Sequence, residues 1–280
     1  MKIARLAASF FILAGAAAAQ AGSYVGGPKL VGTGLVGNAN QGDSVAISSD
    51  GSTAILGAPN DSSNAGAVWV FTRSAGLWTQ QGAKLVFAGA TANAYEGMSV
   101  ALSSDGNTLL AAGASDSSGV AAWVFVRNAG VWTQQGFRLI GTGAVGIPSQ
   151  AFGHAVALSS DGDTALVGGY GDNSSAGAAW VFTRSGGVWM QQGAKLVGTG
   201  AVGGANQGSA VALSSDGNTA LVGGHVDNTN AGAAWVFTRS GGVWTQQGAK
   251  LVATGATGNA GLGFSVTLSG DGNTALVGGP

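Results

Sequence analysis

An internal repeat of about 55 residues runs through most of this chain of 280 residues. The phrase Ser-x-Asp-Gly-x-Thr occurs five times, and the phrase Trp-Val-Phe occurs four times between its copies. The aspartates of the first phrase are Asp50, Asp105, Asp161, Asp216 and Asp271. A repeat of this length indicates a supersecondary unit that buries its apolar face by stacking against its neighbours.

Each unit predicts four short strands, which are clearest in the fourth copy. We expect strands at 210–214, 219–222, 233–239 and 243–252, with a tight Asp-Gly turn after the first and a polar loop at 227–231 after the second. The third strand is apolar on both faces, so its Trp235 is expected to lie between two neighbouring sheets.

The predicted fold is therefore all-β, a β-propeller of four-stranded antiparallel blades, with four complete units and one incomplete unit. A β-solenoid is the alternative, but its coils are usually shorter and lack recurring tight hairpins. The chain stops after the second strand of the fifth unit, which suggests a truncated frame, a fragment, or assembly with another chain. An unclosed arc would expose unpaired strand edges.

The first 21 residues have the pattern of a secretory signal peptide. Lys2 and Arg5 precede an apolar stretch of 14 residues, and Ala19-Gln20-Ala21 is a small-residue cleavage site. An uncleaved anchor is the alternative. The expected mature domain is 22–280, without a membrane span, secreted or at the cell surface, with the periplasm as a further destination.

Composition excludes several classes of function. The chain has no cysteine, so it has neither disulfides nor thiolate chemistry. Only 8% of the residues are charged and no basic residues cluster, which argues against nucleic acid as a partner. The segment 141–146 fits G-x-G-x-x-G, but no helical pattern follows it and the motif recurs in other units, so it does not indicate a dinucleotide site.

Three short motifs carry a resemblance to a known family. They are Phe152-Gly153 ahead of 155–159, Gly57-Ala58-Pro59, and 66–71 with the sequence Gly-Ala-Val-Trp-Val-Phe. The chain resembles the FG-GAP repeats of bacterial surface proteins, which are related to the propeller of integrin α subunits. Most copies depart from these motifs, since Phe-Gly becomes Gln-Gly and Gly-Ala-Pro becomes Gly-Gly-Tyr or Gly-Gly-His.

The resemblance implies calcium loops and a role in adhesion. The calcium candidates are the first residues of four polar loops, Asp61, Asp116, Asp172 and Asp227. Each loop has one carboxylate, whereas Ca²⁺ takes six to eight oxygen ligands. The alternative is that each aspartate caps its own loop through hydrogen bonds to the backbone. No other cofactor is expected.

The sequence predicts no catalytic set, because nearly all charges recur at fixed positions of the repeat. The exceptions among titratable residues are Asp43, Glu96, Asp163, His154 and His225. His154 takes the place of Asp43 in its unit, and His225 takes the place of Pro59. A general acid–base site needs unlike groups that converge on one point, and no such convergence is visible in the sequence.

We therefore expect a non-enzymatic binding or adhesion module that recognises an extracellular protein or glycan through its loops. The loops that vary between units carry the candidate ligand-binding residues Asn60, Asn64, Asn173, His225, Asn228 and Asn230. Two alternatives remain open. One is an extracellular hydrolase, with Asp43 and His154 as the residues to test, and the other is a purely structural or incomplete array.

Overall fold

The computed structural model describes residues 27–90, 93–113, 121–146, 155–255 and 258–280. The expected signal peptide at 1–21 lies outside these residues, as do Asp116, Phe152, Gly153 and His154. Among the described residues, no helix has the length and hydropathy that crossing a membrane requires.

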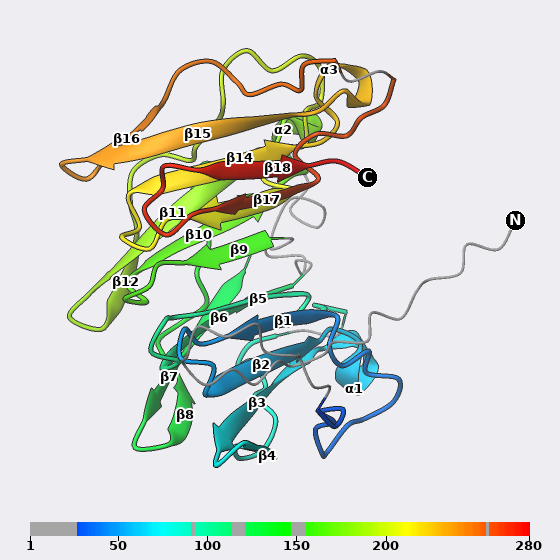
Figure 1. Cartoon of the computed structure of the whole chain (residues 1–280), viewed down its shortest axis with the longest axis vertical. Coiled ribbons are helices and arrows are strands. Elements are labelled where there is room, and N and C mark those ends of the chain that lie inside the picture. Colours follow the sequence, from blue (N-terminus) through cyan, green and yellow to red (C-terminus); the bar gives the residue numbers. More distant parts are fainter. Residues whose placement is uncertain (1–26, 91–92, 114–120, 147–154, 256–257) are drawn as a thin grey trace, which may run out of the picture.

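Four antiparallel sheets of four strands each follow one another along the chain, and we call each sheet a blade (Figure 1). The first blade holds β1 (Ser44–Ile47), β2 (Thr53–Ala58), β3 (Ala67–Ser74) and β4 (Leu77–Gln80), and the second holds β5 (Ser99–Leu102), β6 (Thr108–Ala112), β7 (Ala122–Asn128) and β8 (Val131–Gln134). The third holds β9 (Ala155–Leu158), β10 (Thr164–Gly169), β11 (Ala178–Ser185) and β12 (Val188–Gln191), and the fourth holds β13 (Ala210–Leu213), β14 (Thr219–Gly224), β15 (Ala233–Ser240) and β16 (Val243–Gln246). A two-stranded sheet of β17 (Ser265–Leu268) and β18 (Ala275–Gly278) follows.

The first strand of every blade is its inner strand. β1, β5, β9, β13 and β17 lie beside one another in that order, while the fourth strands lie at the far side of each blade. This arrangement of four-stranded blades is that of a β-propeller, as the repeat predicts.

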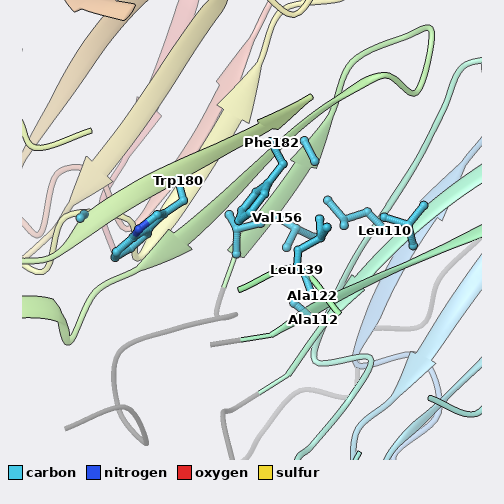
Figure 2. Close-up of a cluster of buried hydrophobic side chains, with 11 residues drawn as sticks. Leu110, Ala112, Ala122, Leu139, Val156, Trp180 and Phe182 are labelled. Carbon is cyan, nitrogen blue, oxygen red and sulfur yellow. The ribbon is translucent and has the colours of Figure 1, made fainter. Parts of the chain in front are cut away.

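Each interface between blades is a layer of apolar side chains from both neighbours. Three tryptophans of the third strands are buried there, Trp123, Trp180 and Trp235, while Trp69 is buried on the outer face of the first blade beside Leu30 and Ala39. Figure 2 shows the layer between the second and third blades, where Leu110 packs with Val156 and Phe182. A buried Trp removes roughly 150–250 Å² from water, so these side chains offset much of the ordering cost of a glycine-rich chain.

One local expectation is wrong. The fourth strand of the fourth unit ends at Gln246 and not at Val252, because Gly248 at φ 70° turns the chain. Leu251 then returns to exchange two backbone hydrogen bonds with Ala234.

Each of three polar loops contains a single helical turn. The turns are α1 (Asp61–Asn64), α2 (Asp172–Ser175) and α3 (Asp227–Asn230). Their middle residues have positive φ, as at Asn228 (50°) and Thr229 (59°), so the turn is partly left-handed.

Candidate active site at the entrance to the inner strands

The three described calcium candidates form the same buried contacts in each loop. Asp61 accepts a hydrogen bond from the backbone N–H of Val36 at 2.8 Å and forms an ion pair with Lys84. The matching pairs are Asp172 with Lys195, and Asp227 with Lys250. A lysine ammonium therefore lies at each of these three carboxylates. Calcium binding stays a prediction.

These aspartates connect distant segments and do not simply cap their own loops. The N–H that reaches Asp61 comes from a residue 25 positions earlier in the chain. Burial alone would raise the pKa of Asp61, but hydrogen bonds from Lys84, Val36 and Ser62 outweigh it and hold the pKa below its usual value. The lysine also lies over the buried tryptophan, with Lys84 Nζ 5.7 Å from the ring centroid of Trp69.

Unlike groups converge at the end of the blades where the inner strands begin. Ser209 directly precedes β13, and His225 directly follows β14. Because β13 and β14 are antiparallel and Ala210 pairs with Gly223, the two side chains lie at the same end of the sheet. Phe264, which directly precedes β17, reaches them from the next sheet. We call Ser209, His225 and Phe264 the entrance site.

The side chains of the entrance site are in direct contact. The Nδ1 atom of His225 lies 3.0 Å from the Oγ atom of Ser209. The hydroxyl of Ser209 in turn donates to the carbonyl oxygen of Gly223 at 3.4 Å. The rings of His225 and Phe264 meet edge to face, with centroids 5.5 Å apart.

Ser209 holds the imidazole on one side, because its hydroxyl oxygen lies against Nδ1 of His225. An imidazole ring with one unprotonated nitrogen can accept a proton near neutral pH. The entrance site is thus an oriented imidazole beside an apolar ring, which is an arrangement suited to general-base chemistry.

The remaining predicted binding residues lie elsewhere. Side-chain hydrogen bonds join Asn60 to Asn64 at 2.9 Å and Asn64 to Asn93 at 3.0 Å. The backbone N–H groups of Asn173 and Asn228 donate to the carbonyl oxygens of Val145 and Val202. The N–H of Asn230 donates to the carbonyl oxygen of Val226 within its own turn. Of the candidate binding residues, only His225 belongs to the entrance site.

Sequence reasoning found His225 but missed both of its partners. Ser209 occupies the same position of the repeat as Asp43, Met98 and His154. Phe264 occupies this position in the last unit. Aligning the units would have shown that this position holds a different residue in every copy. Asp43 is exposed at the matching place of the first blade, and His154 lies outside the described residues.

Comparison with known proteins identifies the fold but not a family. Neither a protein-family model nor a curated protein sequence matches the chain. A solved structure named as a candidate 6-phosphogluconolactonase from Bacteroides uniformis has a TM-score of 0.57 at 17% identity, over 85% of this chain and 64% of that one. The periplasmic gluconolactonase of Pseudomonas aeruginosa has a TM-score of 0.57 at 19% identity, over 84% of this chain and 64% of that one. The chain thus spans less than two thirds of either protein.

These findings correct the resemblance to FG-GAP repeats. No family model supports it, and the two solved structures reported above, which share the fold, bear the names of lactonases. Of the motifs behind the resemblance, Gly57 lies at a close approach to the backbone of Gly97 and 66–71 leads into the apolar third strand, while Phe152-Gly153 lies outside the described residues. Any stacked four-stranded blade requires these features, so they indicate the architecture and not the family.

The expectation of a non-enzymatic adhesion module is wrong for the same reason. Both structures bear the names of enzymes that act on lactones, which favours the hydrolase alternative. The sequence did not reveal the entrance site, because Ser209 and His225 are 16 residues apart and meet only when β13 and β14 pair.

Proposed function

We propose that this protein is an exported hydrolase that opens a cyclic ester, a lactone of the sugar-acid class. The observation that carries the proposal is the 3.0 Å contact between His225 and Ser209 at the entrance site. Support for the substrate class comes from the propeller fold shared with two proteins named as lactonases. Support for export comes from the signal-like segment at 1–21 and from the periplasmic location named for one of them.

The reaction uses water and one base. Nε2 of His225 takes a proton from water as the water oxygen attacks the lactone carbonyl carbon. The ring C–O bond then breaks, and the imidazolium returns the proton to the departing alkoxide, which yields the open hydroxy acid. Such general-base assistance contributes typically 10²–10⁴-fold.

Ser209 acts as a positioning residue in this scheme. Its oxygen lies 3.0 Å from Nδ1 of His225 and 3.4 Å from the carbonyl oxygen of Gly223, and in the proposal a hydrogen bond from Nδ1–H to this oxygen fixes the tautomer and the ring orientation. Phe264 provides an apolar wall on one side of the imidazole. A lactone ring has one polar carbonyl edge and an apolar face, which matches a base beside an aromatic ring.

The test is a titration of acid release from a panel of sugar-acid lactones, corrected for spontaneous hydrolysis. We expect His225→Gln to lower kcat by about 100-fold or more. Ser209→Ala should lower kcat less and shift the pH profile, because the imidazole loses the partner that fixes its tautomer.

Met98→Ala is the matched control, since Met98 holds the position of Ser209 in the second blade and should leave the rate unchanged. A second pair of variants, Asp43→Asn and His154→Ala, tests the site that the sequence suggested for a hydrolase. Full activity in His225→Gln, or acid release from no lactone, would overturn the proposal.

A further inference from the structure

A groove of about 450 Å³ lies between the second and third blades. One wall comes from the segment 135–142, which follows β8, and the other comes from the hairpin that leads into β12. Two of its residues, Leu139 and Phe182, are buried, and Figure 2 shows them in the apolar layer between these blades. Its volume lies in the range of pockets that take small ligands.

One side chain distinguishes this groove from the matching places of the repeat. A glycine after the fourth strand of every blade has a φ of 70–75°, so the backbone turns alike in all four blades. The residue that follows this glycine is Phe137 in the second blade and alanine in the other three, at Ala83, Ala194 and Ala249. The frame therefore does not need an aromatic ring at this position.

Exposed apolar side chains gather in the groove. Phe137 is 94% exposed, Val188 is 61% exposed and Ile140 is 45% exposed, and all three line it. Contiguous apolar surface that faces water is typical of a binding site. Because the groove is open on this side, it can cover one face of a ligand and leave the rest of the ligand in water.

The second aromatic wall, Trp189, is held in place by two contacts. Its Nε1–H donates to the Oε1 atom of Gln135 at 2.9 Å. The guanidinium of Arg184 lies over the indole, 5.4 Å from the ring centroid. The indole is therefore ordered before a ligand binds, which lowers the entropy cost of binding.

Neutral hydrogen-bond donors accompany the aromatic walls. The Oε1 atom of Gln135 accepts from both Trp189 and Arg184, the latter at 3.2 Å. Its Nε2 group lies beside Gly187 of the hairpin and donates to no other residue that the structure describes. The amide of Gln191 also lines the groove. A carboxamide nitrogen carries two hydrogens, so these groups suit a ligand that is rich in oxygen acceptors.

We propose that this groove binds a pyranose ring of an oligosaccharide chain. Such a ring has a face of C–H groups, which stacks on the negative face of an aromatic ring, and an edge of hydroxyl oxygens, which accepts from amides or stays in water. A wholly apolar ligand would instead need the enclosure that this open groove does not provide. The groove lies at the fourth strands and the entrance site lies at the inner strands, so this binding is separate from the proposed catalysis.

The test is calorimetric titration of the purified protein with linear hexasaccharides of glucose, mannose and galactose. We expect the wild type to bind at least one of them. Phe137→Ala should raise the Kd of that hexasaccharide by about 10-fold or more, because the stacking ring is lost. The measurement needs no catalytic activity, so its outcome does not depend on the proposed function.

The repeat allows the site to be moved by one blade. At the next interface Trp244 donates to Gln192 at 2.9 Å and lies 5.3 Å from the guanidinium of Arg239, so the second wall is already present. Ala194 is exposed there, and a phenyl ring at this position has room. The double variant Phe137→Ala/Ala194→Phe should therefore regain the affinity that Phe137→Ala loses.

Phe264→Ala is the control, because it removes the aromatic wall of the entrance site and should leave the Kd of the hexasaccharide unchanged. Far-ultraviolet circular dichroism checks that all variants keep their strands. A wild type that binds none of the three hexasaccharides overturns the proposal. Wild-type affinity in Phe137→Ala, no recovery in the double variant, or a loss of affinity in Phe264→Ala also overturns it.

Discussion

His225 and Asp227 are two residues apart, yet they belong to different parts of the molecule. Asp227 is buried, pairs with Lys250 and repeats at Asp61 and Asp172. His225 is half-buried at the entrance site and stands where other units have proline, alanine or tyrosine. One residue is part of the repeated frame and the other is an exception to it.

This comparison shows how a repeat protein separates stability from chemistry. Repeated charged residues satisfy one another within the frame, so they have little capacity left for a ligand. The residues of the entrance site lie at the open end of the inner strands, where a change of side chain does not disturb the packing between blades. The predictions below test this separation.

The largest effect is expected on removing the repeated carboxylate. Asp227→Ala leaves the ammonium of Lys250 without its ion pair in a mostly buried place, and breaking such a pair costs about 3 kcal/mol of unfolding free energy. Urea unfolding measures the loss. In the double variant Asp227→Ala/Lys250→Met we expect part of the stability to return, because no unpaired charge remains. An unchanged midpoint in the single variant would mean that the frame does not depend on this pair.

A much smaller effect on stability is expected two residues away. His225→Gln changes the contacts with Ser209 and Phe264 at a partly exposed site, and it leaves no unpaired buried charge, so the unfolding free energy should change by less than about 1 kcal/mol. The same urea experiment measures it beside Asp227→Ala. Equal destabilisation by the two variants would show that the entrance site is part of the frame.

The smallest effect concerns the hairpin turns at the other end of the blades. Hydrogen bonds from the Ser48 hydroxyl and from the Ser52 backbone lower the pKa of Asp50 to about 2. Since the folded pKa lies below the unfolded value, the contribution of Asp50 to stability is complete above about pH 4 and is lost as the pH falls through about 2.

Unfolding free energies measured from pH 5 down to about pH 2 check this expectation, with the slope set by proton uptake on unfolding. Asp50→Asn should flatten the acid limb slightly, and the effect is small because the carboxylate is exposed to water. A slope identical to that of the wild type would contradict the lowered pKa of Asp50.

Much of the fold could be predicted from local signals. Asp216-Gly217 forms a hairpin turn because glycine accepts positive φ, and the apolar third strands are buried on both faces. The end of β16 was mispredicted because Leu251 returns to pair with Ala234, a contact that a linear pattern does not reveal. The lysine partners of the loop aspartates were missed for the same reason, since they lie 23 residues further along the chain.

The sequence by itself determined the repeat, the four strands of each blade and the burial of the tryptophans, because turns and alternating side chains are local properties of the backbone. Only the tertiary structure decided which residues meet. Pairing of β13 with β14 brings Ser209 to His225, and stacking of the last sheet adds Phe264. Stacking also buries Ile55, Leu110, Leu166 and Leu221 completely, because burial depends on a neighbouring blade and not on the residue itself.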